Sequence, residues 1–277
     1  MTVNAMSGSE APATSVGSAG LSFRSVSIEY QAQARKIRAV ADASLHVDHG
    51  SFLSILGPSG CGKTSLLKAA AGLLPASTLG EIVLGDVRLN SGNARRNQVG
   101  MVFQTAALLD WLTVRDNVAF PLTTTGVRKS TARELASELL QQAGLGSFAD
   151  NKPYELSGGM QQRAAICRAL IVEPELLLMD EPFGHLDAIT RDQMSIMTQS
   201  LWLRKPITAV LVTHSVAEAV FLSDRVAVMS KGPASRVVTE VDIDLPRPRT
   251  LESRGSAVFQ GYVRELEQAL GLDQMEE

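Results

Sequence analysis

The sequence predicts an α/β fold with a parallel sheet at its centre, and three observations carry this prediction. The apolar run 51–56 directly precedes a glycine-rich loop at 57–64. A second apolar run, 176–179, ends in two carboxylates. Strand-like stretches at 208–213 and 225–229 follow, separated by helix-like ones. Short apolar runs that alternate with helices are typical of parallel strands buried on both faces.

The two ends of the chain differ from this centre. Residues 1–20 are rich in Ser, Ala and Gly without a basic start or apolar centre, which predicts a disordered tail and not a secretory signal. Residues 21–30 and 81–89 alternate enough to be strands of an antiparallel sheet. The segment 233–277 is expected to be a C-terminal extension that ends in an amphipathic helix near 256–270.

The loop at 57–64 has the complete pattern G-x-x-x-x-G-K-[ST] and leads into a helix-compatible stretch, 63–74. Its glycines allow backbone N–H groups to turn toward one point, where the helix N-terminus adds positive charge. Lys63 is expected to reach the outer phosphates of a nucleoside triphosphate, and the Thr64 hydroxyl to bind Mg²⁺. The residues expected to contact nucleotide here are Gly57, Pro58, Ser59, Gly60, Cys61, Gly62, Lys63, Thr64 and Ser65.

Two carboxylates, Asp180 and Glu181, end the second apolar run. A carboxylate at the end of a parallel strand would emerge beside the phosphate loop, where Asp180 can hold magnesium through water. Glu181 can orient and deprotonate the attacking water. An isolated Asp-Glu pair would be read as a solvated strand end, but the complete phosphate loop favours the functional interpretation.

The remaining helices are predicted at 114–122, 130–145, 160–171, 187–204 and 215–222. The first three suggest an α-helical subdomain inserted at about 105–163, after a strand-like segment at 99–103. The last two would return the chain to the parallel sheet.

A second glycine motif, Leu156-Ser157-Gly158-Gly159-Met160, makes the prediction more specific. With the phosphate loop it resembles the ATP-binding subunit of ABC transporters, and the resemblance covers about 21–232, the expected ATP-binding domain. The resemblance implies a P-loop NTPase with a RecA-like parallel-sheet core, an N-terminal antiparallel β subdomain and the inserted helical subdomain. ATP hydrolysis would be coupled to transport across a membrane.

The resemblance assigns further residues by position. Tyr30 matches the aromatic residue that stacks on adenine, and Gln104 matches the Q-loop glutamine, which is expected to contact metal and nucleotide. Asp187 matches the D-loop aspartate and His214 the switch histidine. Taken singly, each of these residues would more often be structural. Together, the motifs and the resemblance imply that the catalytic residues are Glu181, His214 and Lys63.

Ser157 is a good N-cap, so its hydroxyl and the amides of Gly158 and Gly159 would form an anion-binding helix start. In the family this start covers the γ-phosphate bound to a second copy, so two ATP molecules lie between head-to-tail subunits. The resemblance also implies membrane permease subunits, an extracytoplasmic solute-binding protein and a peripheral place at the cytoplasmic face of the inner membrane. Two positions depart from the usual pattern: His185 replaces alanine, and Ser215 replaces aspartate.

Charge and composition exclude several classes. The 26 basic and 29 acidic residues give a net charge of −3, which argues against a broad nucleic-acid or anionic-membrane footprint. The clusters Arg95-Arg96 and Arg247/Arg249 are too small to change this. No stretch approaches the about 18 apolar residues of a spanning helix. The two cysteines imply neither zinc nor a disulfide framework.

Several segments outside the motifs resemble the nitrate, sulfonate and taurine importer ATPases: 108–118, 187–194, 218–226 and 245–249. Import of a small anionic nutrient is therefore expected, with sulfonate or taurine ahead of nitrate. The alternatives are an ABC ATPase that acts on nucleic acid or the ribosome, and a solitary P-loop kinase. The first would carry long coiled coils or two cassettes, and the second would have no use for the motif at Ser157.

Overall fold

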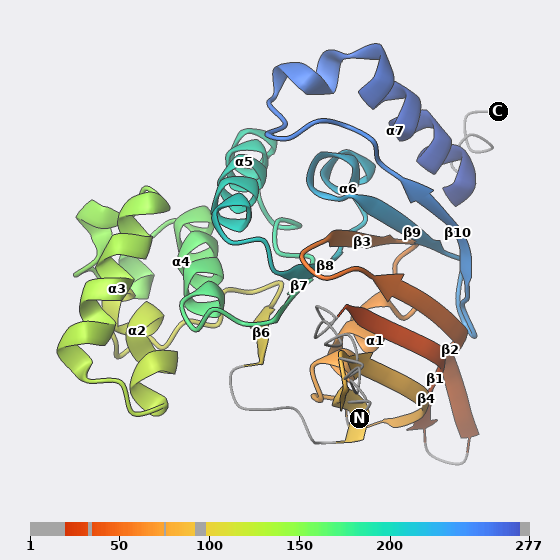
Figure 1. Ribbon diagram of the computed structural model, residues 1–277, viewed down its shortest axis with the longest axis horizontal. Helices are drawn as coiled ribbons and strands as arrows, with labels where there is room; N and C mark the ends of the chain where they lie inside the picture. Colours follow the sequence, from red (N-terminus) through yellow and green to blue (C-terminus); the bar gives the residue numbers. More distant parts are fainter. Residues whose placement is uncertain (1–19, 33–34, 75, 92–97, 272–277) are drawn as a thin grey trace, which may run out of the picture.

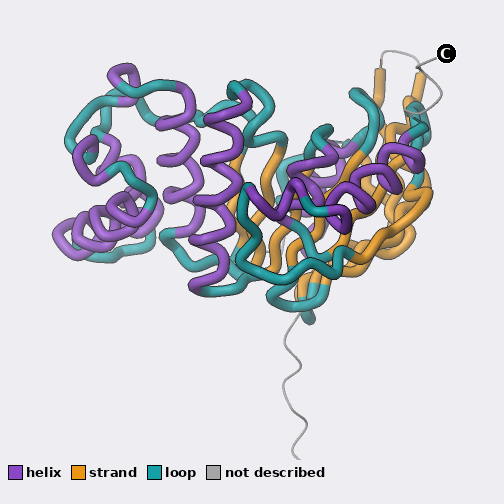
Figure 2. Tube along the Cα trace, turned by 90° about the horizontal axis from the view of Figure 1, so that it is seen from above, coloured by secondary structure: helices purple, strands orange, loops and turns teal. Residues whose placement is uncertain are grey.

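The computed structural model describes residues 20–32, 35–74, 76–91 and 98–271. The expected tail, apart from Gly20, and the Arg95-Arg96 cluster lie outside these residues. The helices of residues 114–170 lie at one end of the molecule, and the two sheets lie at the other with further helices beside them (Figures 1 and 2). Within the described part of the chain, no helix is both long and apolar enough to cross a bilayer.

The larger sheet has six strands in the order β10-β9-β3-β8-β7-β6. Their bounds are β3 Phe52–Leu56, β6 Val99–Val102, β7 Leu176–Asp180, β8 Thr208–Val212, β9 Arg225–Met229 and β10 Val237–Asp242. Every residue of β3, β7 and β8 is buried, which explains their uninterrupted apolar sequences. All neighbours pair in parallel except β10, which runs antiparallel to β9 at the edge.

The smaller sheet is antiparallel, in the order β2-β1-β4-β5. Its strands are β1 Leu21–Ala32, β2 Arg35–Val47, β4 Ser77–Leu84 and β5 Val87–Arg88. The single strand predicted at 81–89 is wrong, because Gly85 (φ +60°) turns the chain and makes a hairpin of β4 and β5. Strand β2 was missed because its first half is exposed and basic, and β10 because charged residues interrupt it.

Seven α-helices lie in the described residues: α1 Lys63–Ala70, α2 Val114–Thr124, α3 Lys129–Gln142, α4 Gly158–Leu170, α5 Ala188–Arg204, α6 Val216–Leu222 and α7 Ala257–Leu270. The same described residues contain four short 3₁₀ helices, at Leu89–Ser91, Gly146–Phe148, Pro153–Glu155 and Glu252–Gly255. Helix α1 ends four residues before the predicted stretch does. There Gly72 (φ +68°) donates to the Ala69 carbonyl and Leu73 to that of Lys68, which closes the helix in a Schellman turn.

Two apolar cores hold these layers together. One contains Leu66 and Leu67 of α1 between the two sheets. The other lies on the opposite face of the large sheet and joins the helices α2 to α6 with Phe259 and Leu266 of α7. The phosphate loop is therefore placed at the boundary where the two sheets meet over α1.

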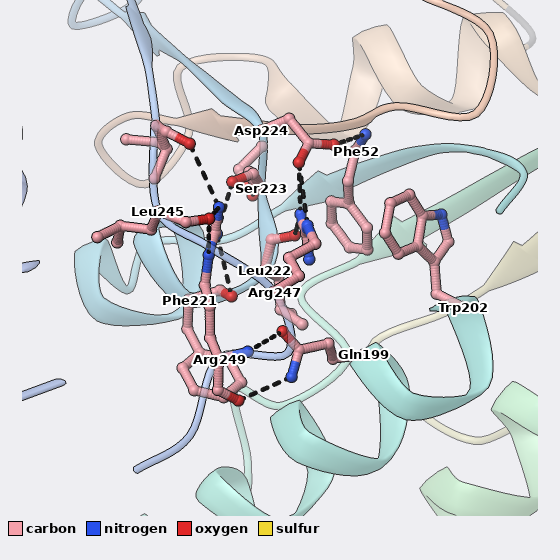
Figure 3. A network of polar contacts seen from close by, with 12 residues as sticks. Phe52, Gln199, Trp202, Phe221, Leu222, Ser223, Asp224, Leu245, Arg247 and Arg249 are labelled. Atoms are coloured by element: carbon pink, nitrogen blue, oxygen red, sulfur yellow. Dashed lines mark hydrogen bonds and ion pairs between the residues drawn. The ribbon is translucent and has the colours of Figure 1, made fainter. Parts of the chain in front are cut away.

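The C-terminal segment is fastened to the large sheet by two arginines (Figure 3). The Arg249 guanidinium, 2 % exposed, donates to the carbonyls that end α6, those of Val220 (2.7 Å) and Ser223 (2.7 Å) among them. The backbone of Arg249 exchanges two hydrogen bonds of 2.8 Å with the side-chain amide of Gln199. Burial lowers the pKa of Arg249 to about 10.

Arg247 completes this attachment. Its guanidinium donates to Oδ1 of Asp224 at 2.8 Å and lies over the Trp202 ring, 4.6 Å from the centroid (Figure 3). Asp224 Oδ2 in turn accepts from the Phe52 amide at 2.8 Å. Arg247 and Arg249 thus connect the extension to α5, α6 and β3.

Candidate nucleotide-binding site

A cavity of about 260 Å³ lies where the phosphate loop, the small sheet and the end of β7 meet. Its lining residues are Tyr30, Ala39, Gly60, Gly62, Lys63, Thr64, Ser65 and Glu181. Tyr30 and Ala39 come from the small sheet, and Glu181 directly follows β7 of the large one, so the cavity forms only when the two sheets pack on α1.

The loop is wrapped around the ammonium group of Lys63. Lys63 Nζ is buried and donates to the carbonyls of Gly57 (2.7 Å) and Pro58 (3.0 Å). Gly60 (φ +75°) and Gly62 (φ +101°) take left-handed conformations that side chains disfavour. At Gly62 a Cβ would also lie 2.7 Å from a methyl group of Val40, so only glycine fits there. The loop therefore carries a positive charge at its centre.

The other loop residues divide between surface and interior. Ser59 is exposed, whereas Cys61 is buried and its carbonyl accepts a hydrogen bond from the Ser235 hydroxyl. The Cys61 thiol lies where a Cβ at Gly57 would be only 2.9 Å away, so this glycine makes room for it. Ser235 comes just before β10, which ties the C-terminal segment to the loop.

Thr64 and Asp180 are brought together from positions far apart in the sequence. The Thr64 hydroxyl donates to Oδ1 of Asp180 at 2.7 Å. Burial raises the pKa of Asp180, and the hydrogen bond from Thr64 acts in the opposite direction. Two hard oxygen ligands at the mouth of a phosphate loop suit Mg²⁺, which prefers oxygen and keeps several waters.

Glu181 stands in an unusual backbone conformation at the end of β7. Its φ is +44°, rare for a residue with a side chain, and its amide donates to the Val212 carbonyl of β8 at 2.8 Å. Its Oε2 lies 3.2 Å from Nδ1 of His214. Backbone outliers gather at functional sites because the fold must hold them in place. Here the outlier turns a carboxylate toward the cavity and toward His214.

Tyr30 makes a contact that the sequence did not predict. Its hydroxyl lies 2.7 Å from that of Ser65, at the start of α1. The ring lines the cavity beside the phosphate loop, as a residue that stacks on a base would. The hydroxyl contact fixes where the ring can lie.

The motif at Ser157 lies apart from this cavity. Ser157 caps α4 by accepting a hydrogen bond from the Met160 amide at 3.3 Å, and none of Ser157, Gly158 and Gly159 lines the cavity. A Cβ at Gly158 would meet nothing within 4 Å, whereas one at Gly159 would lie 2.5 Å from Cγ2 of Thr190. Packing within the chain therefore requires glycine at position 159 but not at position 158.

Asp187 caps the next helix, α5. Its Oδ1 accepts from the Thr190 amide at 3.0 Å and its Oδ2 from the Thr190 hydroxyl at 2.6 Å. These hydrogen bonds lower the pKa of Asp187. The two departures noted in the sequence lie nearby: His185 is exposed, and Ser215 caps α6 by accepting from the Glu218 amide at 3.3 Å. Serine therefore supplies the cap that aspartate would.

Gln104 lies two residues after the end of β6 and is exposed. Two side chains of α4 hold the segment around it: Gln162 donates to the Phe103 carbonyl at 2.9 Å, and Arg168 donates to the carbonyls of Ala106 (2.9 Å) and Ala107 (2.8 Å). Sequence reasoning missed both residues. The only signal that could have indicated their role is that each is a polar side chain on the inner face of the helix predicted at 160–171.

Comparisons with known proteins agree with this geometry. The sequence pattern of the family described as "ABC transporter" matches residues 40–184. The chain is 45% identical over 215 residues to the "Taurine import ATP-binding protein TauB" of Ruegeria pomeroyi. These aligned residues make up 77% of this chain and 79% of that protein. A "Putative ATP-binding protein" of Brucella abortus is 43% identical over 239 residues, with 86% and 88% covered.

Solved structures agree as well. The dimeric bacterial ABC transporter cassette MJ0796 superposes with a TM-score of 0.72 at 31% identity, over 82% of this chain and all of that one. The same cassette in a post-hydrolysis state, bound to ADP and Pi, also gives a TM-score of 0.72, at 30% identity over 82% of this chain and all of that one. The α/β fold with a parallel core and an antiparallel subdomain, predicted from the sequence, is confirmed.

Proposed function

This chain belongs to the ABC transporter family, and we propose that it is the ATP-hydrolysing subunit of an importer for taurine or a closely related sulfonate. The names of its relatives favour taurine over nitrate, the other anion expected from the sequence. The alternative of an ABC ATPase that acts on nucleic acid finds no support among these relatives.

The nucleotide is held by groups from both sheets. Lys63, whose ammonium is already inside the loop, exchanges its contacts to the carbonyls of Gly57 and Pro58 for the outer phosphates of ATP. The loop amides and the start of α1 supply the remaining donors. Tyr30 stacks on the adenine and is oriented by Ser65.

Thr64 and Asp180, with Gln104 after β6, are the residues that would hold Mg²⁺. The 2.7 Å hydrogen bond between Thr64 and Asp180 supports this, because it brings their side-chain oxygens together. The bound ion would neutralise negative charge on the phosphates of ATP. Ionised Asp180 is the form needed for this role, and Thr64 and Lys63 both favour it against burial.

Glu181 is the general base in this proposal. Its carboxylate lines the cavity, and its backbone is tied to β8 through Val212. His214 Nδ1 lies 3.2 Å from that carboxylate and orients it. The general base takes the proton of the attacking water as the γ-phosphoryl group leaves ADP.

A second copy of the chain completes each site. Ser157, Gly158 and Gly159 start α4 outside their own cavity, where capped amides can receive a phosphate from another subunit. The structural neighbour is itself described as dimeric, which supports a head-to-tail pair that closes on ATP.

A groove of about 360 Å³ between β6 and α2 suits the permease. Its lining includes Phe103, Leu109, Phe120, Pro121 and Arg168, and Phe120 is 43% exposed. Arg168 also holds the backbone that follows Gln104, so a permease element in the groove would sense movement there. The subunit would then work at the cytoplasmic face of the membrane, with an extracytoplasmic binding protein delivering cargo.

The observation that carries this proposal is the convergence of Lys63, Thr64 and Glu181 on one cavity. Glu181→Gln keeps the shape of the site and removes the base. We expect this variant to bind ATP, to form a dimer only with ATP and to lose nearly all turnover. Light scattering and phosphate release measure these properties. Lys63→Ala is the matched control, because it should lose ATP binding itself. A Glu181→Gln protein that hydrolyses ATP at the parent rate would exclude this site.

The cargo needs a separate experiment, since it does not touch this subunit. The complex with its permease and binding protein is reconstituted in liposomes with ATP inside. Uptake of labelled taurine, but not of labelled nitrate, is expected, and Glu181→Gln should abolish it. Uptake of nitrate alone would keep the importer assignment and overturn the cargo.

A further inference from the structure

A buried carboxylate lies behind the switch histidine. Glu218 of α6, four residues beyond His214, is 3% exposed. Its Oε2 accepts a hydrogen bond from the Thr213 hydroxyl at 2.6 Å, and its Oε1 forms an ion pair with Arg191 of α5, 3.3 Å from Nε. A buried charge is costly unless it is paired, so these two partners determine where the Glu218 carboxylate can lie.

The Thr213 partner holds the backbone on both sides of His214. The Thr213 amide donates to the Ile55 carbonyl of β3 at 3.3 Å, and the Thr213 hydroxyl accepts from the Ser215 amide at 3.0 Å. The His214 side chain is itself 54% exposed, so packing does not hold its ring. The ring position depends on the backbone that Thr213 and Ser215 fix.

The Arg191 partner reaches the turn before α5. Its Nη2 donates to the Leu186 carbonyl at 2.8 Å. Leu186 directly precedes Asp187, the N-cap of α5. The pair of Arg191 and Glu218 therefore connects the turn that carries Asp187 to the turn that carries His214.

An apolar contact would hold α5 and α6 together without the cost of burying charge. An ion pair also restricts the relative orientation of the two helices, because a carboxylate and a guanidinium group bind each other in only a few geometries. Burial raises the pKa of Glu218, while the Thr213 hydroxyl and the Arg191 charge act against this. Both partners therefore favour the ionised carboxylate that the arrangement needs.

We propose that Glu218 and Arg191 are positioning residues for ATP hydrolysis, which hold His214 beside Glu181 and couple it to the turn of Asp187. The inference rests on the roles given above to Glu181 and His214. Neither Glu218 nor Arg191 lines the nucleotide cavity. Loss of the pair should therefore lower the rate of hydrolysis and leave ATP binding unchanged.

Glu218→Gln tests this with little change of shape. We expect kcat to fall about tenfold or more, while KM and the affinity for a fluorescent ATP analogue stay within about twofold. Arg191→Lys keeps the charge but no longer reaches the Leu186 carbonyl, so it should also lower kcat. If Glu218→Gln does not fold, Arg191→Lys tests the positioning role in its place. In the double variant the losses should not multiply, because both changes break one pair.

Asp116→Asn is the matched control, since it breaks the ion pair of Asp116 with Arg133 on α2 and α3, away from the cavity. It should lower the melting temperature without changing kcat. If Glu218→Gln alters only the melting temperature, as this control does, the pair is merely structural and the inference is wrong. If Glu181→Gln, measured in parallel, keeps parent turnover, the proposed hydrolytic site has failed, and the inference fails with it. If Glu181→Gln is inactive and Glu218→Gln is normal, only the positioning role is overturned.

Discussion

Gly159 and Thr190 lie in such close contact that a Cβ on the glycine would be 2.5 Å from Cγ2 of the threonine. Gly159 is in the first turn of α4 and Thr190 in the first turn of α5, so this contact sets how the two helix starts approach each other. The sequence suggested only that the Gly159 amide binds an anion. The structure adds a packing reason for the same glycine.

The first prediction follows from this contact. Gly159→Ala should destabilise the protein by about 1–3 kcal/mol, because the added methyl group must displace Thr190. Gly158→Ala is the matched control, since its methyl group would meet nothing within 4 Å. Thr190→Ser removes Cγ2 and keeps the hydroxyl that binds Asp187, so it should restore stability to Gly159→Ala. Chemical denaturation checks all three, and equal stability of the two alanine variants would contradict the packing argument.

Tyr30 gives a prediction about the adenine. Tyr30→Phe removes only the hydroxyl contact to Ser65 and should weaken ATP binding by less than about 1 kcal/mol. Tyr30→Ala also removes the stacking face and should cost on the order of 1 kcal/mol more, with little change in the saturated rate. GTP should lose nearly as much affinity as ATP. Titration of each nucleotide measures this, and a severe loss of rate with full affinity would make Tyr30 a fold residue.

Ser157→Arg separates binding from closure. Ser157 does not line the cavity of its own chain, so ATP affinity should survive the change. Hydrolysis should fall almost to background, because the bulky cation blocks the partner's phosphate and the cap of α4 is lost. In a heterodimer with Lys63→Ala, one composite site carries both changes and the other neither, so part of the activity should return. Parent-rate hydrolysis by Ser157→Arg alone would show that Ser157 is only a helix cap.

The helical subdomain should respond to acid. Two hydrogen bonds from Arg133, 2.6 and 2.7 Å long, lower the pKa of Asp116 below its usual value of 3.8. A lowered carboxyl pKa stabilises the fold above the unfolded pKa, and this contribution is lost as pH falls through the folded value. The parent should therefore be more stable than Arg133→Met at pH 7, by an amount that shrinks below about pH 4. Denaturation from pH 3 to 7 checks this; a difference that grows in acid would contradict it.

The attachment of the C-terminal segment depends on Arg249. Arg249→Met leaves the carbonyls at the end of α6 without their donor and should destabilise the fold by about 3 kcal/mol or more. Arg264→Met, on the exposed face of α7, is the control and should change stability by less than about 0.5 kcal/mol. Thermal unfolding compares them, and similar melting temperatures would mean that the buried guanidinium contributes little.

The sequence by itself determined the phosphate loop, the buried strand that ends in Asp180 and the helix start at Ser157. These are local patterns, in which a few neighbouring residues specify a backbone shape and its chemistry. The bounds of β9 and α7 were predicted to within one residue for the same reason, since apolar periodicity is a local signal.

Only the tertiary structure decided which distant side chains meet. No local pattern in the sequence pairs Arg191 with Glu218. They meet because α5 packs against α6, which buries the Glu218 carboxylate beside the partly exposed Arg191 guanidinium. Tyr30 and Ser65 likewise meet only because the small sheet lies against α1. The sequence determines the charge and hydrogen-bonding capacity of each side chain. The partner of each side chain depends on which groups become buried together when the layers pack.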